Sequence, residues 1–223
     1  MLYYRLFVSA FFLAFLFLVS LPATARATVR DVDGNVYRTV AINGLVWMAE
    51  NLDVSRYRNG DPIYHARSMA EWMQAARDKQ GAWCYYENNS GSGPVYGKLY
   101  NWYAVNDPRG LAPEGWRVPG DRDWESLANF FGGKVSAALQ LKATSGWSGG
   151  GATNSSGFSA LPGGYRRCDG RFMYQGTIGL FWTSTKFVPG YAWFRNMNSR
   201  NAVLFRNDTN MGNGISVRCV RQY

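Results

Sequence analysis

The sequence predicts a single α+β domain in which two to three helices precede a loop-rich C-terminal half with short antiparallel strands. Apolar residues recur at helical spacing only in segments that end before Thr144. From Thr144 onward this periodicity disappears, and short aromatic stretches alternate with turns rich in Gly, Ser and Asn. No linker or internal repeat divides residues 28–223, a length that suffices for one domain with a sizeable core.

Residues 1–27 have the layout of a secretory signal peptide. Arg5 supplies a basic start, residues 6–19 are apolar except for one serine, and Ala25-Arg26-Ala27 is a small-x-small cleavage site. The apolar run is shorter than the roughly 20 residues that a spanning helix needs, although an uncleaved N-terminal anchor is the alternative. We therefore expect a secreted, periplasmic or outer-surface protein, cleaved near Ala27, without a transmembrane segment in its mature chain.

The first expected elements are a hairpin and a helix. Residues 36–42 and 45–48 read as strands on either side of Asn43-Gly44, a dipeptide that favours a type I′ turn. Further on, Ser68 and Glu71 have the spacing of a capping box, and apolar residues then recur at helical spacing. These signals predict a β-hairpin followed by a helix that begins after Ser68.

Two more helices are expected before the loop-rich half. One begins after Pro119, carries Asp121 and Asp123 in its first turn, and ends at Gly132-Gly133. Residues 134–141 read as a further short helix. Acidic side chains in a first helical turn serve the cap and the helix dipole more often than acid–base catalysis.

Composition and charge narrow the expected partners. The protein has 16% aromatic and 17% charged residues, as in secreted binding domains that bury rings and expose Asn, Ser, Gly and Thr. Removal of Arg5 and Arg26 would lower the formal net charge from +9 to about +7. The basic residues are dispersed, and export makes a nucleic-acid partner the least favoured.

His65, the only histidine, has no carboxylate at ligand spacing, so we predict no catalytic residue, metal or cofactor.

Six unusual stretches follow one another along the chain: VRDVDGNVYRTVAINGLVWMAENL, GPVYGKLYNWYAVN, APEGWRVPGDRDWESL, GFSALPGGYRRCDGRF, FWTST and GISVRCVRQY. In this order and spacing they resemble the Fibrobacter succinogenes major paralogous domain of secreted bacterial proteins. The resemblance covers residues 28–223 and implies a C-type-lectin-like fold related to that of the formylglycine-generating enzyme, a sulfatase-modifying factor. Six aromatic residues in or between the motifs are expected to pack in the core: Trp116, Trp124, Trp147, Phe158, Tyr165 and Trp182.

The resemblance also bears on the cysteines and on metal binding. Cys84 and Cys219 occupy positions where relatives carry cysteine, which implies a Cys84–Cys219 disulfide and a free Cys168, although three cysteines allow three single bridges. Formylglycine-generating relatives are oxidases with a pair of active-site cysteines, whereas here the cysteines lie far apart in sequence. The Glu-Pro-Asn, Gln-Pro-Asp and Trp-Asn-Asp triplets of Ca²⁺-dependent lectins are absent.

The stretch between Trp182 and Val217 is the candidate functional region. Many relatives carry Asn at nearly every non-framework position here, whereas this chain holds almost every class of side chain. Drift on exposed loops is one explanation. The other is diversification by a retroelement that mutates the adenines of Asn codons. Clustered rings with Arg and Asn are typical of recognition surfaces, so we predict a ligand-contacting face. Its residues are Phe187, Tyr191, Phe194, Arg200, Phe205, Asn207, Asp208 and Asn210.

Together these observations predict a secreted or cell-surface, non-enzymatic recognition module. Its partner would be a protein or glycan outside the cell, contacted by a variable face near the C-terminus. Two alternatives stay open: an enzyme on a scaffold like that of the formylglycine-generating enzyme, and a structural or adhesive surface protein.

Overall fold

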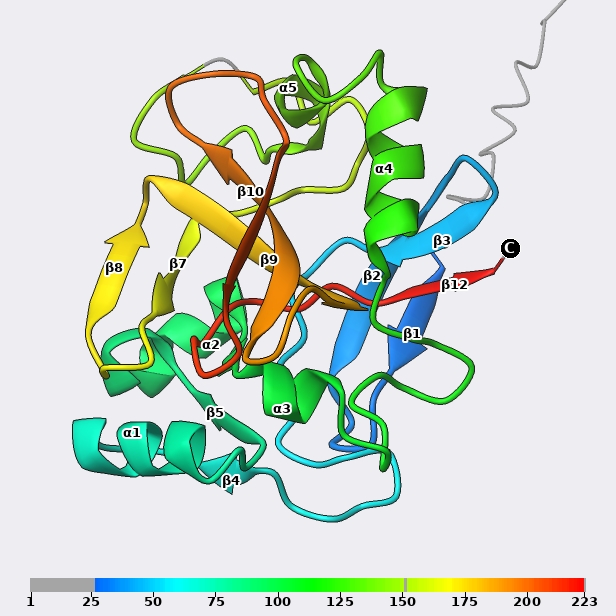
Figure 1. Ribbon diagram of the computed structural model, residues 1–223. Helices are drawn as coiled ribbons and strands as arrows, with labels where there is room; N and C mark the ends of the chain where they lie inside the picture. The colour runs from blue at the N-terminus through cyan, green and yellow to red at the C-terminus, as the bar shows by residue number, and fades with distance from the viewer. Residues whose placement is uncertain (1–26, 151, 223) are drawn as a thin grey trace, which may run out of the picture.

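The computed structural model describes residues 27–150 and 152–222. Apart from Ala27, the predicted signal peptide lies outside these residues. The first strand, β1, begins at Thr28, the residue after the predicted cleavage site. Three sheets and several short helices make up the described structure, which is therefore a mixed α+β fold (Figure 1).

The first sheet joins the two ends of the described chain and has the order β1-β2-β3-β12. Its strands are β1 (Thr28–Arg30), β2 (Val36–Ile42), β3 (Leu45–Met48) and β12 (Val220–Gln222). The predicted hairpin is confirmed, because β2 and β3 pair across Asn43 and Gly44, whose φ angles are 48° and 75°. Positive φ at both central positions is the requirement of a type I′ turn.

The second sheet is small and has the order β4-β5-β6. Its strands are β4 (Tyr64–His65), β5 (Ala82–Cys84) and β6 (Leu99–Tyr100). Helix α1 (Met69–Arg77) joins β4 to β5, and the predicted capping box between Ser68 and Glu71 is present at its start.

The third sheet has five strands in the order β11-β10-β9-β7-β8 and positions the predicted ligand-contacting face (Figure 1). Its strands are β7 (Gly163–Arg166), β8 (Phe172–Gln175), β9 (Ile178–Lys186), β10 (Tyr191–Asn198) and β11 (Phe205–Asn210). The C-terminal half is thus richer in strands than predicted. Both faces of β9 are covered, so its apolar residues form a run instead of the alternation that marks a half-exposed strand. Two strand pairs, β4–β5 and β7–β9, are parallel, whereas only antiparallel strands were expected.

Four further α-helices are described: α2 (Gly93–Tyr96), α3 (Trp102–Val105), α4 (Asp121–Phe130) and α5 (Ala137–Leu141). Two 3₁₀ turns, η1 (Tyr86–Asn88) and η2 (Ser90–Ser92), precede α2. The predicted helices correspond to α1, α4 and α5. The single turns α2 and α3 were missed because four residues are too few to show helical periodicity. Nowhere in residues 27–150 or 152–222 is a helix long and apolar enough to span a bilayer.

Hydrophobic clusters cover both faces of the third sheet. On one face Phe181 and Met197 pack with Trp124 of α4, and on the other Leu180 and Trp182 belong to a second cluster. Of the aromatic residues predicted to lie in the core, four are buried and two are half-buried. Trp116, Trp124, Phe158 and Trp182 are buried, whereas Trp147 and Tyr165 are half-buried.

Arg218 fastens the C-terminal segment to the rest of the fold. It is fully buried and donates hydrogen bonds to Asn51 Oδ1 at 2.7 Å and to the carbonyls of Met48, Phe158 and Ser159. Its guanidinium also lies 4.6 Å from the centre of the Phe158 ring. A charge buried this deeply is stable only when its donors are satisfied, and these four acceptors meet that condition.

Candidate functional site

The predicted face lies mainly on the antiparallel pair β10–β11, and the pleat of these strands divides it. Successive side chains of a strand point to opposite sides, and directly paired residues share a side. The registers Phe194↔Asn207 and Trp193↔Asp208 therefore define two surfaces. We call them the open side (Phe194, Asn196, Phe205, Asn207 and Thr209) and the α4 side (Tyr191, Trp193, Arg195, Arg206, Asp208 and Asn210).

Two arginines of the α4 side form ion pairs with Asp121 at the start of α4. Asp121 accepts hydrogen bonds from Arg195 at 3.1 and 2.6 Å and from Arg206 at 2.7 Å. The Arg206 guanidinium also lies 3.4 Å from the centre of the Trp193 ring. Sequence reasoning assigned Asp121 to the helix dipole, but its carboxylate is shared by two arginines of the sheet, while Asp123 bonds to the Gly120 N–H at 2.6 Å.

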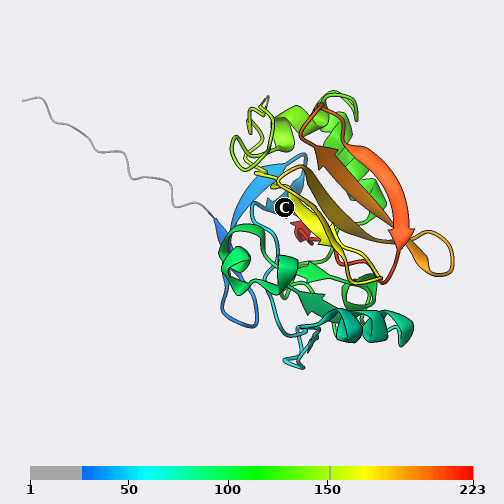
Figure 2. The same ribbon diagram turned by 90° about the vertical axis from the view of Figure 1, so that its left-hand side faces the viewer.

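The hairpin joining β9 and β10 projects from the molecule (Figure 2). Phe187, Val188 and Tyr191 at this tip are 46%, 42% and 42% exposed. Phe187 lies 4.5 Å from the Trp193 ring, and Trp193 is on the α4 side. Two predicted contact residues, Phe187 and Tyr191, are thus separated from the open side.

A hollow of about 220 Å³ occupies the open side. Phe194 and Asn207, both predicted contact residues, line it together with Asn196 and Thr209. The remaining lining residues are Tyr165, Tyr174, Ile178, Leu180 and Ile215. Strands β7 and β8 thus supply one wall, and β10 and β11 supply the polar edge.

The polar edge of this hollow keeps hydrogen-bonding capacity. Asn207 Nδ2 donates to Asn196 Oδ1 at 2.9 Å. Among the residues described, no hydrogen bond occupies the Asn196 amide nitrogen or the Asn207 amide oxygen. Thr209 Oγ1 accepts from Asn213 Nδ2 at 2.7 Å, so the Thr209 hydroxyl hydrogen is available for another acceptor.

Two tyrosines form the wall opposite. The rings of Tyr165 and Tyr174 are 6.1 Å apart and inclined by 32°. Tyr174 has φ 67° and is 48% exposed, so a bulky residue is held in a disfavoured backbone conformation at the rim. Beside it, Gly164 has φ 65°, and a Cβ there would lie 2.5 Å from the Met173 carbonyl oxygen. Burial raises the pKa of the Tyr165 phenol, which keeps its hydroxyl protonated.

A second hollow of about 540 Å³ adjoins the first, since both are lined by Tyr174 and Ile178. Its other lining residues are Ser148, Thr177, Asn198, Ser199 and Arg200. We call the two hollows together the groove. Lys142, which is 2% exposed, donates to the carbonyls of Asn198 at 3.2 Å and Asn201 at 3.0 Å, and so holds the loop that carries Arg200.

Sequence reasoning therefore found part of the groove and missed its tyrosine wall. Phe194, Arg200 and Asn207 line it, and Phe205 lies on the same side. Tyr191, Asp208 and Asn210 belong to the α4 side, and Phe187 packs against Trp193 of that side, so the structure divides the predicted contact residues between two surfaces. Tyr165 was assigned to the core. Tyr174 gave no sequence signal, because β8 and β11 are opposite edges of the third sheet and only the tertiary structure brings residues of both to one hollow.

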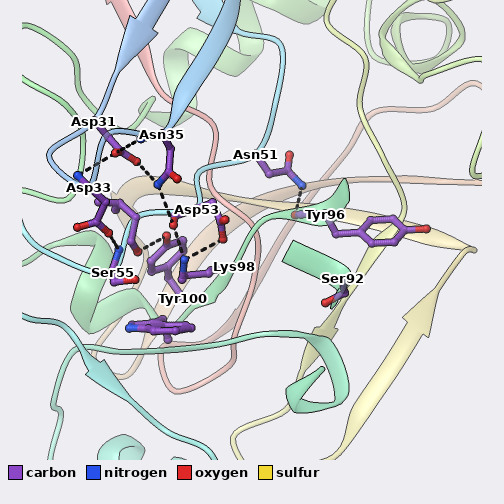
Figure 3. A network of polar contacts seen from close by, with 12 residues as sticks. Asp31, Asp33, Asn35, Asn51, Asp53, Ser55, Ser92, Tyr96, Lys98 and Tyr100 are labelled. Carbon is purple, nitrogen blue, oxygen red and sulfur yellow. Dashed lines mark hydrogen bonds and ion pairs between the residues drawn. The ribbon is translucent and has the colours of Figure 1, made fainter. Parts of the chain in front are cut away.

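A largely buried polar network near β1 and β6 is the second cluster of titratable side chains considered as a site (Figure 3). Asp31 accepts hydrogen bonds from the backbone N–H groups of Asp33 and Asn35 and from the hydroxyl of Tyr37. Lys98 Nζ lies 2.9 Å from Asp53 Oδ1 and 4.6 Å from the Trp83 ring centre.

This network connects segments of the fold. Burial raises the pKa of the Asp53 carboxyl, an effect that Lys98 opposes. The Asp31 oxygens already accept hydrogen bonds from N–H and O–H donors, so they do not fit a metal ion. The described residues contain no group of three or more His, Cys, Asp or Glu side chains that could hold a metal ion. His65 stacks on Trp83 at 3.7 Å, and burial lowers its pKa.

The predicted Cys84–Cys219 disulfide is wrong, because all three cysteines are free thiols. Cys84 packs with Trp72 and Ala82 in one hydrophobic cluster, whereas Cys219 belongs to the cluster around Tyr100. Burial raises the pKa of Cys84 to about 11 and that of Cys219 further, so neither is a reactive thiolate at neutral pH. Cys168 is half-buried.

Comparison with known proteins identifies the family. The profile of the Fibrobacter succinogenes major domain matches residues 40–221. The chain belongs to this family. The match to the Fibrobacter succinogenes major domain begins within β2, ends within β12 and includes every described residue that lines the groove. No curated protein and no solved structure shows significant similarity to the chain.

Proposed function

We propose that this protein is a non-enzymatic recognition module that works outside the cytoplasm and binds a ligand in the groove. The observation that carries the proposal is the unoccupied hydrogen-bonding capacity of Asn196 and Asn207 beside the exposed ring of Tyr174. Polar groups that serve the fold are normally satisfied within it, as Asp121 and Arg195 are. Amides and tyrosines left facing solvent in a hollow are typical of ligand sites.

The groove is also held in shape before any ligand arrives. Lys142 fixes the loop that carries Arg200, and Gly164 permits the close approach of β7 and β8 that presents Tyr174. A site whose residues are already positioned loses less conformational entropy on binding. This rigidity supports recognition of a specific ligand over unspecific adhesion.

The proposed location is the exterior of the cell or the periplasm, after cleavage near Ala27. The layout of residues 1–27 supports it. We also propose the C-type-lectin-like assignment and its relationship to the formylglycine-generating enzyme. The order and spacing of the six motifs support that assignment.

Diversification of the groove by a retroelement is part of the proposal. The positions at which relatives carry Asn include Phe194, Arg200 and Asn207 in the groove, and also Tyr191, Asp208 and Asn210 on the α4 side. Sequencing the gene and its flanks tests this. A reverse transcriptase gene and a near-copy of the codons for residues 187–213, differing only at adenines of the copy, would support it. A gene without either would limit the variation to ordinary drift.

Adhesion through the β9–β10 hairpin is the second candidate, favoured by the exposure of Phe187, Val188 and Tyr191. The two proposals are separated by binding of the labelled exported protein to intact bacterial cells and to polysaccharide and protein fractions of the culture. Tyr174→Ala with Asn207→Ala removes groove contacts, whereas Phe187→Ala with Tyr191→Ala removes the hairpin contacts. We expect only the first pair to abolish binding. Unchanged binding by that pair would refute recognition through the groove.

A further inference from the structure

We infer that the groove binds a neutral saccharide, with a sugar ring against Tyr174 and its hydroxyl groups at the paired amides of Asn196 and Asn207. This inference rests on the proposed recognition function and specifies its ligand class. Three properties of the groove lead to it: its charge, its aromatic wall and the arrangement of its amides.

The charge of the groove argues for a neutral ligand. Among the described residues, none of the nine that line the first hollow is charged, and Arg200 is the one charged residue lining the second. By contrast, a hollow near β1 is lined by Arg30, Asp31, Arg58 and Glu114. A chain with a formal charge of +9 has basic residues available for an anionic ligand, yet the groove excludes nearly all of them.

The aromatic wall suits a ligand with an apolar face. Tyr165 and Tyr174 are inclined to each other by 32°, and Phe194 and Leu180 lie in the same hollow. A pyranose ring has C–H groups on its faces and hydroxyl groups around its edge. Stacking such a face on a tyrosine removes apolar surface from water while the edge stays polar.

The amide pair suits the edge of the same ring. When two asparagine side chains bond head to tail, one NH₂ group and one carbonyl oxygen still point outward, whichever way the amides are turned. Neighbouring sugar hydroxyls can accept from the first and donate to the second. The Thr209 hydroxyl adds a donor because its oxygen already accepts from Asn213.

The size and form of the groove favour more than one sugar unit. The first hollow measures about 220 Å³ and the second about 540 Å³, and they share Tyr174 and Ile178. Hollows of this combined size are in the range of small-molecule sites. An extended peptide adding to the edge strand β11 is less favoured because Arg206 and Asp208 on that strand are charged, as in edges protected from pairing.

The test is binding of the exported protein to an array of neutral oligosaccharides built from glucose, mannose, xylose or N-acetylglucosamine. Polygalacturonate, heparin and a library of unmodified peptides serve as the other arms. We expect at least one neutral oligosaccharide to bind. Its affinity should be reduced about tenfold or more in Tyr174→Ala and in Asn207→Ala, relative to the parent protein. Phe187→Ala is the matched control and should bind like the parent protein. Equal melting temperatures would show that the variants are folded.

The outcomes separate this inference from the proposed function. Binding only to an anionic polymer or only to a peptide, when it depends on Tyr174, overturns the saccharide assignment and leaves recognition through the groove intact. Binding to cells that depends on Tyr174, without binding to any neutral oligosaccharide at millimolar concentration, also overturns the assignment. Cell binding that ignores both groove variants overturns the proposed function as well.

Discussion

The two sides of β10 and β11 differ in what happens to their polar groups, although alternate residues of the same strands form both. On the α4 side, Asp121 pairs with Arg195 and Arg206, and Arg206 lies over Trp193. On the open side, Asn196 and Asn207 bond to each other and keep further capacity facing the groove. The run of chemically varied residues near the C-terminus therefore contains positions bonded within the fold and positions that face the groove, and the alternation of side chains along each strand distinguishes them.

Replacement of Asp121 should have the largest effect on stability. Asp121→Ala leaves Arg195, which is 4% exposed, without its carboxylate, and loss of one partner of a buried ion pair costs about 3 kcal/mol or more. Asn207→Ala, on the open side, should change stability by only about 0.5 kcal/mol. Urea denaturation of both variants measures the difference. Equal midpoints would abolish the distinction between the two sides.

Gly164→Ala should be the next most damaging change, and it should also disturb the groove. It places an L-residue at φ 65° with its Cβ 2.5 Å from the Met173 carbonyl oxygen, so β7 and β8 must separate. We expect a loss of about 2 kcal/mol or more. Gly176→Ala is the control, because Gly176 has φ 80° but nothing within 4 Å of an added Cβ. Thermal unfolding should show the smaller loss for Gly176→Ala, and similar losses would argue against the close approach.

Substitutions at Tyr174 should affect ligand binding more than stability, the reverse of the effects expected at Asp121 and Gly164. Because Tyr174 has φ 67°, Tyr174→Gly should be more stable than Tyr174→Ala by about 1 kcal/mol. Both variants lack the ring and should lose binding to the same extent. Paired denaturation and binding titrations test this expectation. A glycine variant that is no more stable than the alanine variant would mean that the backbone at position 174 is unstrained.

The smallest expected effect concerns His65, which lies away from both sides and provides a reference for pH dependence. Burial beside Trp83, together with repulsion from Arg67, lowers the pKa of His65 in the folded protein. The unfolded chain therefore takes up this proton at a higher pH than the folded protein does. The stabilisation that accompanies neutral His65 is fully present above about pH 6.5 and is lost as the pH falls. His65→Gln should lose less stability between about pH 7 and 5 than the parent protein. Parallel curves in urea denaturation would contradict this.

Local signals in the sequence were sufficient for several elements. Asn43-Gly44 placed a hairpin whose strand bounds the structure confirms, and Ser68 with Glu71 marked the start of α1. The disulfide prediction failed because it depended on where Cys84 and Cys219 lie in space, and they pack in separate clusters. Family membership, in contrast, could be recognised from motif order alone.

Patterns in the sequence were enough to predict the family, the hairpin, the three longer helices and four of the six aromatic residues expected in the core. Turn preferences, caps and helical periodicity act over a few residues, so they can be read directly from the chain. The sheet order, the division of β10 and β11 into two sides, and the tyrosine wall of the groove could be recognised only in the folded chain. Those features depend on pairing between distant segments, such as Asp121 with Arg206, and on strand register, because a shift of one residue would exchange the two sides.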